Sequence, residues 1–247
     1  MQFSDEEVER YARHLVLREI GGPGQQKLKR ARVAMVGAGG LGAPAALYLA
    51  AAGVGELVLI DPDRVDRSNL QRQVLYREAD LGRSKARSAC AALGDLNPNV
   101  GLVPVEARLE ASNAVELLRG MDLVLDGTDD FSTRFCVNEA CLKLNVPLIS
   151  GAIGRWTGQV GVFAGRPCYR CLVPEAPPDA ETCQAVGVIG ALAGVIGSMM
   201  ALEAVKVISA AGEALKGRLL IYDGLAGEAR TVRLAPDPGC PACGVPS

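Results

Sequence analysis

Four cysteines occur as two C-x-x-C pairs, Cys168 with Cys171 and Cys240 with Cys243. Two intervening residues let both thiolates of a pair reach one metal ion, and four thiolates suit tetrahedral zinc. The gap between the pairs exceeds the usual zinc-ribbon spacing, so the site would tie the C-terminus to the middle of the chain. Four protein ligands leave no open coordination position, so we expect a structural metal. A redox role of one pair is the alternative.

A glycine-rich loop follows an apolar run of strand length. Gly37, Gly39 and Gly42 fit G-x-G-x-x-G between residues 33–36 and an alanine-rich stretch. Such glycines let the backbone approach phosphates, and the helix N-terminus adds partial positive charge. Asp61, about 20 residues further on, is placed to hold ribose hydroxyls. The pattern predicts a nucleotide site without separating NAD from ATP; tight strand-to-helix packing is the alternative use of the glycines.

Two cations follow Asp61, namely Arg72 in Ser68-Asn-Leu-Gln-Arg-Gln73 and Lys85. A hydride-transfer site needs an apolar floor for the nicotinamide, whereas a triphosphate gains negative charge as pyrophosphate leaves. Cations suit the triphosphate better. Taken alone, each side chain could instead be a solvated surface charge.

Aspartates follow a third buried strand in the run Asp126-Gly-Thr-Asp129-Asp130. Ligands of open parallel sheets bind beyond the carboxyl ends of the strands, where aspartates can hold magnesium. We expect one of Asp129 and Asp130 to cap the helix that begins at Phe131.

Other candidates are less specific. Cys183 lies between a proline-rich loop and a glycine-rich helix, where a lowered thiol pKa would make it reactive. Arg13 lies on the first helix and can face a ligand, a partner subunit or solvent. The remaining cysteines are expected to be small buried hydrophobes within helices: Cys90, Cys136 and Cys141.

The elements that must position these residues alternate along the chain. Apolar runs predict strands at 33–36, 57–60, 100–105, 123–125, 147–149, 159–164, 218–222 and 230–234. Helices are predicted at 5–18, 25–29, 45–52, 84–96, 112–119 and 131–144, with a capping box at Ser4 and Glu7 and a break at Gly21–Gly24. We therefore expect an α/β fold with a Rossmann-like, doubly wound, mainly parallel sheet that continues into antiparallel strands.

The composition excludes several classes of function. The 247 residues have a net charge of −2 and 4% aromatics, which argues against a nucleic-acid coat. His14 is the single histidine, so a site with two histidine ligands is excluded. Residues 182–202 carry no charge, but their glycines and alanines favour a buried helix over a membrane span. The N-terminus lacks a signal-peptide core, so we expect a cytoplasmic protein without membrane or nucleic-acid partners.

Together these motifs resemble one family, the adenylyltransferases that activate ubiquitin-like sulfur-carrier proteins. These enzymes are bacterial relatives of the adenylation half of ubiquitin-activating enzymes. The resemblance runs from about Val8 to Gly244. Its most specific parts are Arg10-Tyr-x-Arg13, Gly37-x-Gly-Gly-Leu-Gly42, Ser68-Asn-Leu-Gln-Arg-Gln73, Thr128-Asp129 and the two cysteine pairs.

The resemblance implies roles for individual residues. ATP would be bound by Gly37, Gly39, Gly40, Gly42, Asp61, Ser68, Asn69, Leu70, Gln71, Arg72, Lys85, Asp129 and Asp130. Catalysis would rest on Arg13, Arg72, Lys85 and Asp129, with Arg13 reaching into the site of the other subunit of a homodimer. Asp129 would bind magnesium, and the two cysteine pairs match the family's zinc ligands. Many relatives have Thr-Asp-Asn at Thr128–Asp130, which leaves any role of Asp130 beyond the metal shell open.

The implied reaction joins AMP to the C-terminal glycine carboxylate of a carrier ending in Gly-Gly and releases pyrophosphate, which prepares thiocarboxylate formation. The sulfur would come from a separate donor, because the chain is too short for an appended sulfurtransferase domain. We favour the molybdopterin-synthase carrier, because Ser150-Gly-Ala152 and Gly158-Gln159 resemble that branch. Residues 44–49 resemble the thiamin branch instead. Cys183 resembles a crossover-loop cysteine found in both, so it does not choose the pathway.

We expect one adenylation domain over 1–247, with an N-terminal helical arm at 1–30, a nucleotide-binding part at 31–165 and a zinc-clipped, carrier-binding part at 166–247. Two other classes remain as alternatives. An NAD-dependent dehydrogenase is supported only by the glycine loop and Asp61. A non-catalytic nucleotide-binding scaffold would have the same loop and the zinc-stabilised tail.

Overall fold

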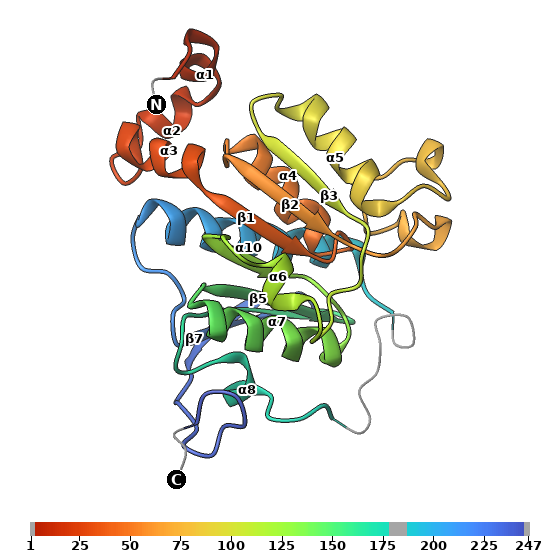
Figure 1. Ribbon diagram of the computed structural model, residues 1–247, viewed down its shortest axis with the longest axis vertical. Coiled ribbons are helices and arrows are strands. Elements are labelled where there is room, and N and C mark those ends of the chain that lie inside the picture. Colours follow the sequence, from red (N-terminus) through yellow and green to blue (C-terminus); the bar gives the residue numbers. More distant parts are fainter. Residues whose placement is uncertain (1–2, 178–186, 245–247) are drawn as a thin grey trace.

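The computed structural model describes residues 3–177 and 187–244 and is built around one mixed sheet (Figure 1). Its strand order is β3-β2-β1-β4-β5-β6-β7-β8. The strands are β1 (Arg32–Val36), β2 (Glu56–Ile60), β3 (Gly101–Val105), β4 (Leu123–Asp126), β5 (Leu148–Gly154), β6 (Thr157–Phe163), β7 (Arg218–Asp223) and β8 (Glu228–Arg233). β1 to β5 pair in parallel, and β5 to β8 pair antiparallel, which confirms the predicted fold class.

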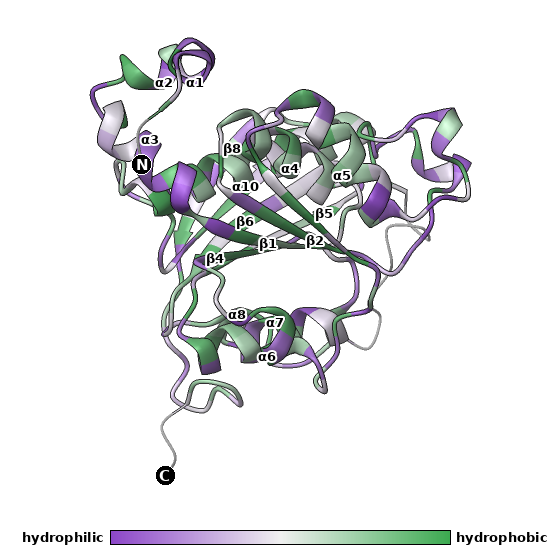
Figure 2. Ribbon diagram, turned by 45° about the horizontal axis from the view of Figure 1, so that its top comes forward, coloured by the Kyte–Doolittle hydropathy of each residue, from purple (hydrophilic) through white to green (hydrophobic). Residues whose placement is uncertain are grey.

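The helices form two layers around the sheet (Figure 2). α4 (Gly42–Ala51), α5 (Lys85–Leu96) and α10 (Gly190–Ser209) cover one face, and α6 (Ala114–Leu117), α7 (Phe131–Leu144) and α8 (Tyr169–Leu172) lie on the other. Successive strand residues point to opposite faces, so β1 contributes to both cores. Val33 and Met35 pack in the core that includes α4 and α10, and Ala34 and Val36 pack in the core that includes α7.

The strand order changes direction at β1. The chain runs outward from β1 through β2 to β3 and then returns to place β4 on the other side of β1. The loops after β1 and β4 therefore diverge and leave a crevice at their carboxyl ends, which is where open α/β sheets bind ligands. The glycine loop follows β1, and the aspartate run ends β4. The topology thus brings together two motifs that lie about 90 residues apart in the chain.

The N-terminal arm differs from the single helix predicted at 5–18. The chain forms α1 (Asp5–Arg10), interrupted at Tyr11, and then α2 (Ala12–Leu15). Tyr11 is buried and its hydroxyl accepts a hydrogen bond from Asn97 Nδ2 at 2.9 Å, so tertiary packing overrides the helical pattern. The predicted capping box of Ser4 and Glu7 is present.

The predicted break at Gly21–Gly24 is wrong, because these residues form the first turn of α3 (Gly21–Arg30). The first amide groups of a helix have no partner within it, so Pro23 costs no hydrogen bond there. Other predicted bounds also change. The helix at 112–119 shortens to α6, and the strand at 147–149 extends into β5 because residues through Gly154 pair with β6.

α10 is the one helix in the described part of the chain that is long and apolar enough to cross a membrane. It packs against α4, α3, β5 and β6. The contact with α4 is close, because a Cβ on Gly197 would lie 2.5 Å from the Leu41 carbonyl oxygen and from Pro44. Its buried apolar residues, among them Ile196 and Met200, therefore serve packing within the domain. Residues 182–186 of the uncharged segment lie outside the described residues.

Candidate active site and cysteine cluster

A cavity of about 390 Å³ opens at the carboxyl ends of the parallel strands. Nine residues of the predicted ATP site line it: Gly37, Gly39, Gly40, Asp61, Asn69, Arg72, Lys85, Asp129 and Asp130. Four other residues of that prediction, Gly42, Ser68, Leu70 and Gln71, are not part of its wall. The cavity is large enough for a small-molecule ligand.

Three glycines of the loop, Gly37, Gly40 and Gly42, differ in what they do. Gly37 has φ +84°, a left-handed conformation that favours glycine. A Cβ on Gly42 would lie 1.9 Å from the Gly37 carbonyl oxygen, so this glycine allows α4 to approach the end of β1. By contrast, a Cβ on Gly40 would meet Ala193 and Arg72 at ordinary distances of 3.5 and 3.6 Å, and Gly40 lines the cavity. The packing use foreseen from the sequence is therefore present at Gly42, and Gly40 leaves the backbone open to the cavity.

Asp61 directly follows β2 and supports the glycine loop. Its Oδ2 accepts a hydrogen bond from the Ala38 amide at 2.8 Å, and its Oδ1 accepts one from the Asp63 amide at 2.8 Å. Burial raises the pKa of the Asp61 carboxyl, and the nearby charge of Lys85 opposes this rise. The carboxylate is therefore fixed in direction at the cavity wall, where it can also accept from a ligand hydroxyl.

The two predicted cations, Arg72 and Lys85, both line the cavity. Lys85 is the first residue of α5, and its buried Nζ lies 2.9 Å from Asp63 Oδ2. Arg72 is half-buried and donates from Nη1 to the Ser68 carbonyl at 3.2 Å. Asn69 is buried beside them, and its Nδ2 donates to Ser68 Oγ. Cations held in this way can stabilise negative charge without first reorganising.

The aspartates at the end of β4 have different environments: Asp126 and Asp130 accept hydrogen bonds from backbone amides, and Asp129 is exposed. Asp126 is buried, and its Oδ1 accepts hydrogen bonds from the amide and the hydroxyl of Thr128 at 3.0 and 2.7 Å. Asp130 caps α7 by accepting from the Thr133 amide at 2.8 Å, which confirms that one of the pair is a cap. Asp129 is exposed on the cavity wall, so it is the member best placed to bind a cation.

Arg134 and Gln73 line the cavity but are absent from the predicted site. Arg134 is 6% exposed and donates to the carbonyl oxygens of Thr128 and Gly151. Among the described residues, Gln73 Oε1 is the buried side-chain atom without a hydrogen-bond partner. Gln73 belongs to a motif that the sequence did single out, whereas an arginine inside a predicted helix gives no signal of its burial.

Arg13 does not reach this cavity. It is exposed on α2, in the N-terminal arm, and the neighbouring His14 Nδ1 lies 2.9 Å from Gln25 Oε1. Any contact of Arg13 with a nucleotide would therefore be made in the cavity of another copy of the chain.

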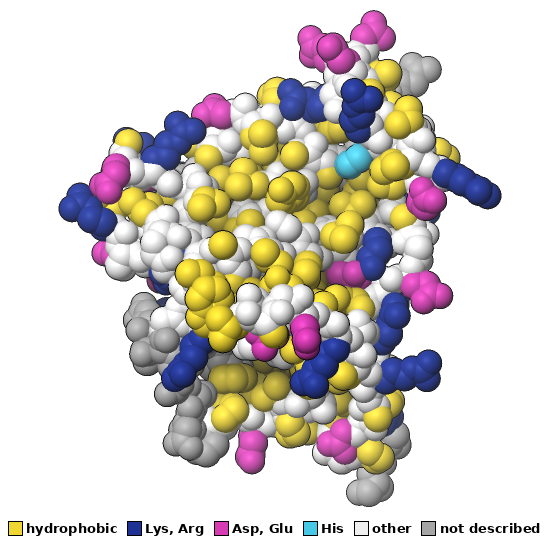
Figure 3. Space-filling model, turned by 180° about the vertical axis from the view of Figure 1, so that it is seen from behind, with side chains coloured by type: hydrophobic (Ala, Val, Ile, Leu, Met, Phe, Trp, Pro, Cys, Tyr) yellow, Lys and Arg dark blue, Asp and Glu magenta, His cyan; other side chains and the backbone are white. Residues whose placement is uncertain are grey.

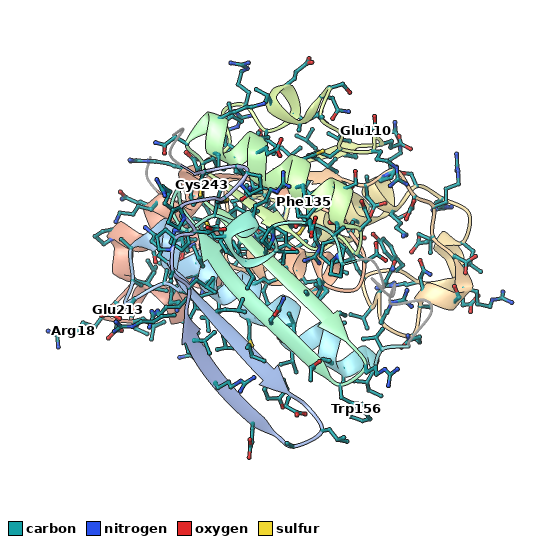
Figure 4. All side chains as sticks on the ribbon, turned by 90° about the horizontal axis from the view of Figure 1, so that it is seen from below. Arg18, Glu110, Phe135, Trp156, Glu213 and Cys243 are labelled. Atoms are coloured by element: carbon teal, nitrogen blue, oxygen red, sulfur yellow. The ribbon has the colours of Figure 1, made fainter. Side chains whose placement is uncertain are left out.

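The four predicted metal-binding cysteines form one cluster, with all sulfurs within 4.8 Å of one another. The Cys168 and Cys240 sulfurs are 3.6 Å apart, and those of Cys171 and Cys243 are 3.4 Å apart. Tetrahedral zinc with bonds of about 2.3 Å separates its sulfur ligands by about 3.8 Å. The cluster therefore fits zinc. In Figure 4, Cys243 lies near the α8 end of the antiparallel strands, opposite Trp156 at the tip of the β5–β6 hairpin.

The other cysteines follow the prediction in part. Cys141 is buried, whereas Cys90 and Cys136 are half-buried. Burial raises the pKa of the Cys90 thiol to about 11 and that of Cys141 to about 12. Cys183 lies outside the described residues.

A family model, that of the ThiF family, matches residues 11–242. The chain belongs to the ThiF family. The family indicated by the motifs is thereby confirmed.

Curated relatives of this ThiF-family chain match it along nearly its whole length. It is 48% identical over 241 residues to the SAMP-activating enzyme E1 of Haloferax volcanii. That match covers 96% of this chain and 89% of that protein. It is 46% identical over 253 residues to the sulfur carrier protein adenylyltransferase of Thermus thermophilus, covering 99% of this chain and 93% of that protein. A third relative, the probable adenylyltransferase/sulfurtransferase MoeZ of Mycobacterium tuberculosis, is 48% identical, and the match covers 63% of its length.

Solved structures share the fold of this ThiF-family chain. The structure of E. coli MccB with MccA-N7isoASN superposes with a TM-score of 0.84 at 24% identity and covers 95% of this chain and 75% of that one. At this identity, the likeness concerns the fold alone.

Proposed function

We propose that this ThiF-family protein is an adenylyltransferase that uses ATP to activate the C-terminal carboxylate of a ubiquitin-like sulfur carrier protein. The observation that carries the proposal is the cavity, which unites a glycine loop, a ribose-binding type of aspartate, two cations and an exposed aspartate. The relatives named as a sulfur carrier protein adenylyltransferase and a SAMP-activating enzyme support the choice of substrate.

The proposed reaction needs alignment and charge stabilisation rather than a base. A carboxylate oxygen of the carrier's terminal glycine attacks the α-phosphorus of ATP. The new P–O bond forms as the bond to the bridging oxygen breaks, and the electron pair leaves with pyrophosphate. Gly40 and its neighbours approach the phosphates, and Asp61 holds the ribose. Arg72 and Lys85 stabilise the charge that develops on the leaving group.

The metals that the proposal implies have candidate ligands. Asp129 would hold magnesium, which neutralises phosphate charge when bound. The cysteine cluster would hold zinc as a structural ion, since its four sulfurs leave no open position.

The proposed active form is a homodimer in which Arg13 enters the cavity of the partner copy. The molecule has a broad apolar face over α4 and α10, seen from behind in Figure 3 with His14 near its edge. Tyr48 and Leu202 on these helices are 59% and 60% exposed, and Val16 beside α2 is 78% exposed. An apolar surface of this kind, next to the arm that carries Arg13, fits a second copy of the chain.

The remaining assignments are also proposals. The part from 166 to 247 binds the carrier, a separate protein donates the sulfur, and the reaction takes place in the cytoplasm. The carrier that we favour is the molybdopterin-synthase subunit. The thiamin-pathway carrier is the alternative. Two relatives named as combined adenylyltransferases and sulfurtransferases, MoeZ and MOCS3, are compatible with the molybdopterin-synthase carrier.

Pyrophosphate exchange tests the activity. Label should pass from pyrophosphate into ATP only when a carrier ending in Gly-Gly is present. Arg72→Ala and Asp129→Ala should each lower exchange more than about tenfold, or about 1.4 kcal/mol on the barrier. Arg67→Ala is the matched control, because Arg67 lies in the same segment, pairs with Glu78 and does not line the cavity. Absence of exchange with a panel of such carriers would refute the proposal, and NAD reduction by a small alcohol would favour a dehydrogenase instead.

Mixed dimers test the contribution of Arg13. Arg13→Ala and Lys85→Ala should each be inactive alone. When equal amounts are mixed and allowed to exchange subunits, half of the dimers contain one intact site, so activity should recover to about a quarter of wild type. If Arg13 acted within its own subunit, mixing would restore nothing.

A further inference from the structure

Arg134 lines the cavity and also contacts Tyr169, which lies beside the cysteine cluster. Arg134 is a buried residue of α7, with Nε donating to the Thr128 carbonyl at 3.1 Å and Nη2 donating to the same oxygen and to the Gly151 carbonyl. Thr128 immediately precedes Asp129, the candidate magnesium ligand. Arg134 therefore fixes the backbone at the base of the turn that carries Asp129.

The charge of Arg134 is retained despite burial. Burial disfavours the guanidinium cation, but the nearby Asp126 carboxylate favours it, and the net effect raises the Arg134 pKa. Asp126 in turn holds the Thr128 amide and hydroxyl. The two sides of the same turn are thus held by a buried cation and a buried anion. Burial of such charges costs desolvation energy, and well-packed apolar side chains of similar volume are often no less stable in their place.

Contacts also reach Arg134 from the side of the cysteine cluster. Tyr169 lies between the two cysteines of the first pair, and its hydroxyl accepts from Arg134 Nη1 at 3.4 Å. The Tyr169 ring lies 5.9 Å from Arg134 Cζ. Asn138, one turn along α7, accepts from the Tyr169 amide at 2.9 Å and donates from Nδ2 to Cys168 Sγ at 3.7 Å. A continuous chain of contacts therefore joins a cluster sulfur to the Asp129 turn.

We propose that Arg134 is a positioning residue that holds the Asp129 turn in its cation-binding position, and that the cysteine cluster holds Arg134 through Tyr169 and Asn138. The inference rests on the proposed function, because it takes Asp129 as the magnesium ligand. Groups that support a metal ligand typically change metal affinity about 10–100-fold when they are removed. Loss of the Arg134 contacts should therefore weaken magnesium-dependent nucleotide binding without removing the glycine loop.

Titration of ATP binding without any carrier tests the inference. The dissociation constant of ATP is measured by calorimetry across a range of magnesium concentrations for wild type, Arg134→Lys and Tyr169→Phe. Arg134→Lys keeps a cation but loses the forked donors, so the magnesium concentration for half-saturation should rise about tenfold or more. Tyr169→Phe keeps the ring and loses the hydroxyl, so it should shift in the same direction by less. The cluster's metal content, measured in parallel, should not change in Arg134→Lys.

Arg170→Gln is the matched control. Arg170 also lies between the first pair of cysteines, packs 4.7 Å from the Phe135 ring and pairs with Glu139, but it makes no contact with the Asp129 turn among the described contacts. It should bind ATP with the wild-type magnesium dependence. Removal of the cluster's metal from wild type by a chelator, followed by removal of the chelator and the same magnesium titration, should reproduce the Arg134→Lys shift.

The possible results separate the two proposals. If wild type does not bind ATP with magnesium, the proposed function fails. If wild type binds but Arg134→Lys and Tyr169→Phe keep the magnesium dependence of Arg170→Gln, the inference about Arg134 is overturned while the function stands. If Arg134→Lys does not fold, Tyr169→Phe alone decides by the direction of its shift.

Discussion

Alanine should affect different properties at Gly40 and Gly42: ATP affinity at Gly40 and stability at Gly42. A Cβ at position 42 would lie 1.9 Å from the Gly37 carbonyl oxygen and 2.9 Å from the Gly37 carbonyl carbon. Both neighbours are backbone atoms, so α4 and the end of β1 would have to separate by about 1 Å. Overpacking of this kind costs about 1–3 kcal/mol, and occasionally more when the backbone must move.

We therefore expect Gly42→Ala to lower the free energy of unfolding by about 2 kcal/mol. The figure is the middle of the overpacking range of about 1–3 kcal/mol, and no helix-propensity gain offsets it because Gly42 is the first residue of α4. For a domain of this size, Tm should fall by about 4–8 °C. Gly40→Ala meets ordinary contacts, so its Tm should stay within about 2 °C of wild type. Because its Cβ would enter the cavity wall, its affinity for ATP should fall about tenfold or more.

Thermal unfolding followed by circular dichroism measures the first effect, and calorimetric titration with ATP and magnesium measures the second. A wild-type Tm for Gly42→Ala would refute the packing role of Gly42. Equal losses of stability in both variants would refute the separate roles of the two glycines, because Gly40 would then also be a packing glycine. Wild-type ATP affinity in Gly40→Ala would remove Gly40 from the phosphate site.

Three further predictions concern the rest of the molecule. Cys243→Ser, or removal of the metal by a chelator, should lower the free energy of unfolding by at least about 2 kcal/mol. The control variant Cys90→Ser should keep the wild-type stability. Denaturant unfolding curves and the metal content of each variant measure the two effects. Because burial raises the pKa of Cys90 to about 11 and of Cys141 to about 12, only about one thiol in a thousand of Cys90 is ionised at pH 8. Both should resist iodoacetamide in the native protein, with Cys90 labelling speeding up as pH rises toward 11, and complete labelling at pH 8 detected by mass spectrometry would contradict this. Asn97→Ala leaves the Tyr11 hydroxyl and the Ala50 carbonyl without their donor, so it should cost about 1–3 kcal/mol in denaturant unfolding, whereas the exposed Asn99→Ala should cost little.

The sheet could be predicted because its strands are buried on both faces. Residues 33–36, 57–60 and 123–125 are apolar without interruption, and all lie in the central strands. The N-terminal arm could not be predicted in the same way. The break at Tyr11 depends on Asn97 and Gly53, which are distant in sequence, and the glycines of α3 give a local signal that the helix overrides.

Some residues of the candidate site could be predicted from the sequence, and others could not. Gly40, Asp61 and Asp129 follow directly from strand ends, because the carboxyl ends of parallel strands meet at one edge. Arg134 has no such marker. Its spacing in α7 is that of any helical residue, and only the folded chain reveals that its guanidinium is buried against the Thr128 carbonyl. Residues that act through backbone contacts are therefore the ones that sequence patterns miss.

The distribution of titratable groups also favours one class of chemistry. The single histidine, His14, is bound to Gln25 in the N-terminal arm and does not line the cavity. The wall instead combines cations with aspartates, two of which are committed to the backbone amides of Ala38 and Thr133. Among the described residues, this wall has no histidine, and it is rich in fixed charge. It suits a substrate that is already a nucleophile, as a carboxylate is, and a leaving group that gains negative charge. Adenylyl transfer to a carboxylate meets both conditions, whereas hydride transfer meets neither.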